Sequence, residues 1–245
     1  MLFTDNTDIV SSILWTVSYL SDGHHEDITK IVNIDLMERA IFYIKKEEIF
    51  LTIPAIRICG NVFAGSNEFC DFFLQQDGLK ALNKLMQTRN SSIQKECCWA
   101  VSNLAAGTEE QIQALLSDRI IDTVMQLVRE SNPEVQREAI WVVCNLLTTG
   151  TQKQVELVGE LGMIEMLIPH LTSFQDPSML LLILEAITQY LHFGEPQRDD
   201  DDNLFAIRFD ELGGVKALEE LQTHQNITIY NHVVEMLDRF YTLEK

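Results

Sequence analysis

KECCWAVSNLAAG (95–107) recurs one unit later in the chain as REAIWVVCNLLTTG (137–150). Two earlier stretches, IPAIRICGNVFAG (53–65) and ILWTVSYLSDG (13–23), keep the same register at intervals of 42 residues. Two positions recur at this interval, an aromatic residue or arginine and, one helical turn later, an amide or tyrosine: Trp15, Arg57, Trp99 and Trp141, then Tyr19, Asn61, Asn103 and Asn145. A period of this length is typical of helical repeat proteins, in which each unit buries its apolar face against its neighbours.

The repeated stretches lie in four segments with helical periodicity, at 8–20, 51–63, 92–105 and 133–147. In the last segment the apolar residues fall on one face, whereas Glu138, Trp141 and Asn145 share another. The tryptophan therefore lies outside the core stripe. An aromatic residue and an amide that recur on one face of every unit predict an array along a single surface, and such an array suits an extended polymer.

Capping residues and glycines mark the expected helix ends. Asn132 is a suitable N-cap, and Pro133 suits the first helical turn, where its missing N–H has no partner to lose. Gly107 and Gly150 are expected to end their helices in a left-handed turn.

Two shorter amphipathic segments precede a long one, as at 109–116 and 120–129 and again at 151–161 and 164–171. Further segments with helical periodicity follow at 177–191 and 228–241. Three helices in a unit of about forty residues are the armadillo pattern. We therefore predict an all-α fold, a right-handed superhelical solenoid of armadillo repeats in one domain. The expected units are a partial repeat that supplies only a third helix, four repeats, and an acidic loop with a capping repeat: 1–22, 23–65, 66–107, 108–150, 151–197 and 198–245.

The charge of the chain restricts its partners. Eighteen lysines and arginines against 37 acidic residues give a net charge of −19, which repels phosphate backbones and disfavours direct binding to nucleic acid. A basic protein or peptide is the complementary partner. The alternative is that the acidic residues only keep a long solenoid soluble, and charge does not separate the two.

Membrane insertion and secretion are not expected. The longest uncharged apolar stretch, 179–184, is far shorter than the roughly 20 residues of a spanning helix, and the N-terminus lacks the pattern of a signal peptide. The predicted location is intracellular.

Five cysteines without a C-x-x-C pair are expected to be small buried residues: Cys59, Cys70, Cys97, Cys98 and Cys144.

Catalytic and metal-binding motifs are missing from the sequence. It contains no G-x-S-x-G, no H-E-x-x-H and no glycine loop for phosphate, so neither an enzyme nor a cofactor site is expected. Residues 199–203 imitate the start of a calcium loop, but Leu204 occupies the position that needs glycine and Asp210 replaces the final glutamate. A disordered acidic loop is the preferred interpretation. His24 and His25 have no further ligand at suitable spacing, so no metal is expected there.

Taken in order, the four quoted stretches resemble successive repeats in the C-terminal half of importin-α, the adaptor that carries nuclear localisation signals. That family has a W-x-x-x-Y unit followed by S/T-D-G, an arginine-for-tryptophan repeat after a proline, and two W-x-x-x-N repeats, as here. The stretch ELGGVKALEELQTHQNITIYNHVVEMLDRFY (211–241) is similar to the family's final repeat. The resemblance covers nearly the whole chain.

The repeated residues predict how a peptide is held. Neighbouring helices pack about 8–10 Å apart, so Trp99 and Trp141 are expected to form walls of a slot for a lysine or arginine stem, with cation–π attraction. Asn103 and Asn145 can bond to the main chain of an extended peptide. Glu96 and Glu138 are placed to receive the cationic groups. The alternative for these glutamates is a solvated position near a helix N-terminus.

By resemblance, nine residues match the smaller of two peptide sites in the family: Arg57, Asn61, Glu96, Trp99, Ser102, Asn103, Glu138, Trp141 and Asn145. Trp15, Tyr19 and Asp22 match the unit that bridges the two sites. An arginine in the register of Arg57 is typical of the family, where it separates the larger site from the smaller.

The resemblance implies a nuclear import adaptor, either a fragment or a truncated form, that shuttles between cytoplasm and nucleus with basic cargo peptides. It also implies contact of the C-terminal repeats with an export receptor. Binding to importin-β requires a basic N-terminal arm, which this sequence does not include. The alternative is an armadillo scaffold, such as a catenin-like adaptor, without a transport role. Those grooves generally favour basic linings, the opposite of this charge balance.

Overall fold

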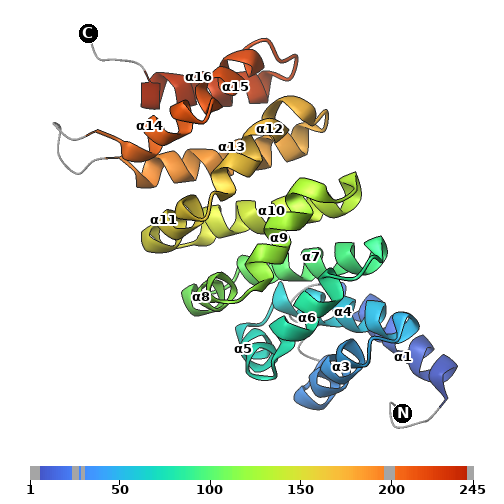
Figure 1. The fold of residues 1–245 in the computed structure, drawn as a ribbon. Helices are drawn as coiled ribbons and strands as arrows, with labels where there is room; N and C mark the ends of the chain where they lie inside the picture. The colour runs from blue at the N-terminus through green and yellow to red at the C-terminus, as the bar shows by residue number, and fades with distance from the viewer. Residues whose placement is uncertain (1–5, 24–27, 29–30, 196–201, 242–245) are drawn as a thin grey trace. The chain divides into compact units, whose positions relative to one another are not determined.

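The computed structural model describes residues 6–23, 28, 31–195 and 202–241. Helices and connecting turns make up these ranges, and no strand occurs within them, so the predicted all-α class is confirmed. In chain order the helices are α1 (Thr7–Leu20), α3 (Ile34–Lys46), α4 (Ile49–Phe63), α5 (Asn67–Gln75), α6 (Gly78–Met86), α7 (Ser91–Ala105), α8 (Glu109–Ser117), α9 (Ile120–Glu130), α10 (Pro133–Thr149), α11 (Gln152–Glu160), α12 (Met163–Ser173), α13 (Pro177–Phe193), α14 (Leu204–Glu211), α15 (Gly214–Leu221) and α16 (Ile227–Tyr241) (Figure 1).

The helices follow the predicted pattern. From α5 onward they come in threes, two short helices followed by one of 15 to 17 residues. The four helices of the repeated register agree with their predicted bounds to within two residues, because the apolar periodicity continues up to each cap. Two compact units divide the chain, Met1–Val142 and Val143–Lys245.

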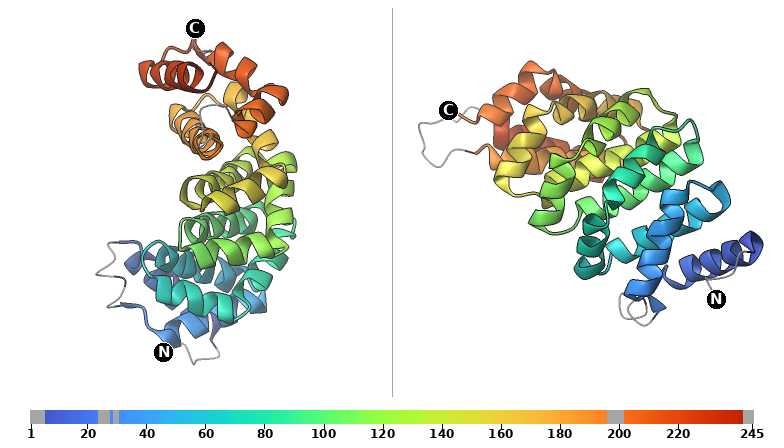
Figure 2. Two further views of the ribbon diagram at one scale, coloured as in Figure 1. Left: turned by 90° about the vertical axis from the view of Figure 1, so that its left-hand side faces the viewer. Right: turned by 60° about the horizontal axis from the view of Figure 1, so that its bottom comes forward.

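In the first unit α4 lies between α1 and α7 and packs against both, and it also contacts α3 (Figures 1 and 2). This environment explains why α4 is buried on nearly every side. Ala55, Ile58, Cys59 and Val62 are at most 1% exposed. A fully buried aliphatic side chain of this kind stabilises the fold by about 1.5–3 kcal/mol.

All five cysteines are buried and free, which confirms the prediction of small core residues. Burial raises the pKa of each thiol, and that of Cys70 rises to about 12. These cysteines therefore stay protonated and pack as apolar groups.

The helix ends are partly as predicted. Asn132 caps α10, because its side-chain Oδ1 atom accepts hydrogen bonds from the N–H groups of Glu134 and Val135 at 3.1 and 3.2 Å. The left-handed turns expected at Gly107 and Gly150 are wrong, since neither residue has a positive φ. Space is the reason for glycine at both positions. A Cβ at 107 would lie 2.0 Å from the Gln111 side chain, and one at 150 would lie 2.5 Å from the Leu146 carbonyl oxygen.

An aromatic pair joins two helices of the second unit. Tyr190 of α13 is 1% exposed, and its ring stacks on Phe205 of α14 at 4.5 Å between centroids. Asn203 caps α14 and donates its amide to the carbonyl of Leu191, so its side chain ties α14 to the end of α13.

Residues 199–201 of the predicted acidic loop lie outside the described residues. Within the described part of the chain, no helix combines the length and apolar character needed to span a bilayer.

Candidate peptide-binding site

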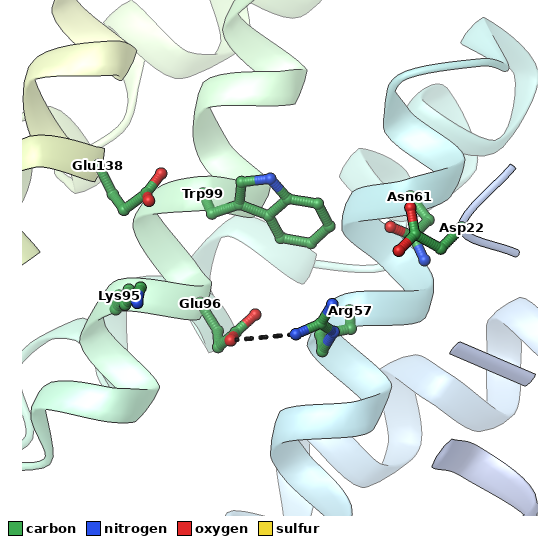
Figure 3. A pocket seen from close by; sticks show the side chains of 7 residues that line it. All are labelled: Asp22, Arg57, Asn61, Lys95, Glu96, Trp99 and Glu138. Atoms are coloured by element: carbon green, nitrogen blue, oxygen red, sulfur yellow. Dashed lines mark ion pairs between the residues drawn. The ribbon is translucent and has the colours of Figure 1, made fainter. Parts of the chain in front are cut away.

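Seven side chains of the first unit line a cavity of about 340 Å³: Asp22, Arg57, Asn61, Lys95, Glu96, Trp99 and Glu138 (Figure 3). They come from the turn after α1, from α4 and α7, and from the first turns of α10. Six of the seven belong to the residues selected from the sequence. Lys95 is the exception, and the sequence analysis missed it.

The Trp99 indole lies against the backbone of α4 at Gly60. A Cβ at position 60 would be 2.3 Å from the indole Cζ3 atom, so only glycine leaves room for the ring. Trp99 is therefore half-buried, with part of the ring packed on α4 and part bordering the cavity (Figure 3). Trp15 is half-buried as well, and Trp141 is 37% exposed. All three indoles thus keep an accessible part, as the position outside the core stripe predicted.

Arg57 places a cation of the chain itself beside this indole. Its Cζ atom is 6.0 Å from the centroid of the Trp99 ring, and its Nη1 atom is 3.6 Å from Glu96 Oε1 (Figure 3). The Nε atom is buried and has no hydrogen-bond partner among the described residues. Arg57 therefore occupies one ring face and one carboxylate of the kind that a guest cation was expected to use.

The two glutamates of the cavity are half-buried, and burial raises the pKa of both carboxyl groups. Arg57 and Lys95 oppose the rise at Glu96. At Glu138 the opposing cations are Lys95 and Arg137, and the neighbouring Glu96 adds to the rise. A carboxylate that has lost part of its hydration gains more from a nearby cation than an exposed one does.

Two of the repeated asparagines, Asn61 and Asn103, tie their helix to the preceding long helix. The amide of Asn61 donates to the Ser18 carbonyl oxygen at 2.9 Å and to the Ser21 hydroxyl at 3.1 Å, and that of Asn103 donates to the Gly60 carbonyl oxygen at 2.9 Å. Asn61 is only 6% exposed. The amides were expected to bond to the main chain of a peptide, and the structure also gives those of Asn61 and Asn103 a role between repeats. Nothing in the sequence pattern distinguishes the two roles.

The remaining selected residues lie outside the cavity lining. Ser102 is 4% exposed, and its hydroxyl donates to the Trp99 carbonyl oxygen. Tyr19 is 66% exposed and stacks on Trp15 at 5.8 Å. Asn145 is half-buried in α10, within the second unit. His24 and His25 lie outside the described residues.

Comparison with known families and proteins places the chain among repeat proteins. Residues 66–106 and 108–148 match the Armadillo/beta-catenin-like repeat family, and residues 203–245 match the Atypical Arm repeat family. Importin subunit alpha-3 of Arabidopsis thaliana is 38% identical over 96% of this chain and 45% of its own length. Importin subunit alpha-1b of Oryza sativa subsp. japonica is 32% identical over 100% of this chain and 46% of its own length. The chain spans about half the length of the curated relatives it matches.

Solved structures confirm the predicted armadillo solenoid fold. A designed armadillo repeat protein matches with a TM-score of 0.83 and 22% identity, over 97% of this chain and 95% of that chain. A second design, solved in complex with the peptide (KR)4, matches with a TM-score of 0.84 and 23% identity, over 98% of this chain and 96% of that chain.

Proposed function

Because the chain belongs to the importin-α family of armadillo-repeat proteins, we propose that its first unit binds lysine- and arginine-rich peptides as part of a nuclear import adaptor. The guests are nuclear localisation signals, as the family resemblance implies. The observation that carries this proposal is the accessible indole of Trp99 in one cavity with two half-buried carboxylates, Glu96 and Glu138.

Cation recognition follows from this arrangement. The aliphatic stem of a guest lysine or arginine lies against the accessible parts of Trp99 and Trp141, and its charged end approaches Glu138. Each cation–π contact contributes roughly 0.5–2 kcal/mol, depending on how far it is desolvated. Because Arg57 already holds Glu96, the carboxylate of Glu138 is the more available of the two.

Main-chain recognition is assigned to the asparagines that follow the aromatic register. Among the described residues the Asn103 side chain bonds only to the Gly60 carbonyl oxygen, which leaves its second N–H and its Oδ1 atom for a peptide. An extended peptide advances about 3.3 Å per residue, so side chains two or three positions apart reach successive helices. The proposed contacts in the first unit are Trp15, Tyr19, Asp22, Arg57, Asn61, Glu96, Trp99, Asn103, Glu138 and Trp141. Asn145 is proposed by the same resemblance, as the amide that follows Trp141 on α10.

The acidic charge and one solved structure support a basic guest. The net charge of −19 attracts cationic peptides over long range. The designed armadillo protein bound to (KR)4 has the same fold and a basic peptide. The contacts proposed for this chain are argued from its own cavity residues.

The transport role extends to the whole protein. We propose that the protein shuttles between cytoplasm and nucleus and that its C-terminal repeats contact an export receptor. A contact with importin-β requires a basic arm outside this sequence. The alternative is an armadillo scaffold that binds another class of partner without transport.

Fluorescence anisotropy with a labelled lysine-rich peptide tests the binding proposal. The same peptide with every lysine replaced by glutamate is the control. We expect saturable binding of the basic peptide alone, weakening as salt rises because charges at the surface are screened over about 10 Å at 0.1 M. Equal binding of both peptides contradicts the proposal. Peptide binding without nuclear accumulation of a fused cargo in permeabilised cells identifies the scaffold alternative.

A further inference from the structure

Lys95 is a second cation that the chain places at the proposed peptide site. It lies one helical turn before Trp99 on α7 and lines the same cavity (Figure 3). Its Nζ atom is 3.2 Å from Oε2 of Glu134 on α10. Since Glu134 and Glu138 are four residues apart on α10, they lie on one face of that helix. The Lys95 ammonium group therefore faces a row of two carboxylates.

The contact between Lys95 and Glu134 is easily exchanged. Their side chains are 41% and 76% exposed, and exposed ion pairs add little to stability. Lysine carries its charge on a flexible four-carbon stem, and one turn along α10 measures about 5.4 Å. Movement from Glu134 to Glu138 is therefore within the range of the side chain. The lowering effect of Lys95 on the pKa of Glu138 agrees with this proximity.

Arg57 differs from Lys95 in this respect. Its guanidinium group packs beside Trp99, and its Nε atom is buried. Displacement of Arg57 from Glu96 therefore requires repacking against the indole. Lys95 can leave its carboxylate without such a change.

We propose that Lys95 is a tethered competitor for the cations of the guest peptide at Glu138, and that it raises the number of basic residues a guest needs for a given affinity. This inference rests on the proposed function. A guest cation at Glu138 must compete with the Lys95 ammonium group, which can reach this carboxylate from Glu134, so a single basic residue gains little. A cluster of basic residues makes further contacts at Trp99 and Trp141, which offset the displacement of Lys95.

Lys95→Met tests the competition, because methionine keeps an unbranched apolar stem and removes the charge. Affinities are measured by anisotropy for peptides with two and with four lysines in an otherwise identical neutral background. We expect Lys95→Met to tighten both complexes by about three- to tenfold, the effect of one partly exposed charge pair. Lys95→Arg keeps the charge and is expected to bind as the parent chain does.

Two further variants separate direct competition from a change in net charge. Lys80→Met removes a charge from α6, where Lys80 is 74% exposed and paired with Asp77, and it should leave the affinity nearly unchanged. In a Glu138→Gln background most of the gain from Lys95→Met should disappear. The inference is overturned by unchanged affinity in Lys95→Met, by an equal gain from Lys80→Met, or by a gain that survives intact in the Glu138→Gln background. Failure of the parent chain to bind either peptide instead contradicts the proposed function itself.

Discussion

The Trp99 indole rests on the α4 backbone at Gly60, where a Cβ would lie 2.3 Å from the ring. The position of this recognition residue is therefore set by the preceding repeat as well as by its own helix. Gly60 directly precedes Asn61, whose amide ties α4 to the end of α1. Packing between repeats and the shape of the cavity thus depend on the same short stretch of α4.

Gly60→Ala is expected to displace Trp99 and weaken the binding of basic peptides. The added methyl group has no space, and overpacking of this kind typically costs about 1–3 kcal/mol. Tryptophan fluorescence and peptide affinity report the change. Gly23→Ala is the matched control, because a Cβ there meets no atom of the described residues within 4 Å. Parent-like fluorescence and affinity in Gly60→Ala contradict the assigned packing.

Asn61→Ala and Asn103→Ala are expected to destabilise the fold to different degrees. Asn61 is buried and donates to two acceptors, so its loss should lower the free energy of unfolding by about 1–3 kcal/mol. Asn103 is less buried and donates to one acceptor, which predicts about 0.5–1.5 kcal/mol. Urea unfolding followed by circular dichroism ranks the two variants. A larger loss of stability in Asn103→Ala than in Asn61→Ala would contradict the role of the Asn61 hydrogen bonds in joining the repeats.

Peptide binding is expected to release protons. Burial raises the pKa of Glu96 and Glu138, and a guest cation favours their ionised forms. Affinity for the peptide should decline as pH falls through these raised pKa values. The decline should begin at a higher pH than it would for exposed glutamates, whose pKa is about 4.3. Calorimetry in two buffers of different ionisation enthalpy measures the released protons. The Glu96→Gln/Glu138→Gln variant should show a flatter pH dependence, and an unchanged profile in that variant excludes these groups.

The five cysteines should resist modification in the folded protein. All are buried, and burial raises the pKa of their thiols. A thiol reagent such as DTNB should react with all five only after unfolding in denaturant. Rapid reaction of Cys97 or Cys98 in the native state would show that α7 opens locally.

Much of the fold could be predicted because repetition amplifies a weak local signal. One W-x-x-x-N stretch says little, but four related units in register, two of them W-x-x-x-N, place the long helices and put Trp99 outside the core. The left-handed turns assigned to Gly107 and Gly150 were wrong. Glycine is required at 107 and 150 because a Cβ would collide with Gln111 and with the Leu146 carbonyl oxygen, respectively. These contacts form only when the chain is folded.

The site was less predictable than the fold. A lysine four residues before a tryptophan, such as Lys95, has the same sequence pattern as any solvated lysine on a helix. Its place beside Glu134 depends on the distance between α7 and α10. Likewise the bond from Asn103 to Gly60 joins residues 43 positions apart, and the spacing alone does not show which partner an amide selects.

Calorimetric titration of a lysine-rich localisation peptide into the parent chain and into Trp99→Ala/Trp141→Ala tests the central claim most directly. Phe42→Ala serves as the control, since Phe42 on α3 is an aromatic residue with 43% exposure that does not line the cavity. The account predicts that the tryptophan variant loses at least about tenfold in affinity, or roughly 1.4 kcal/mol, while Phe42→Ala binds as the parent does. Equal affinity of the parent and the tryptophan variant would contradict recognition of basic peptides by these indoles.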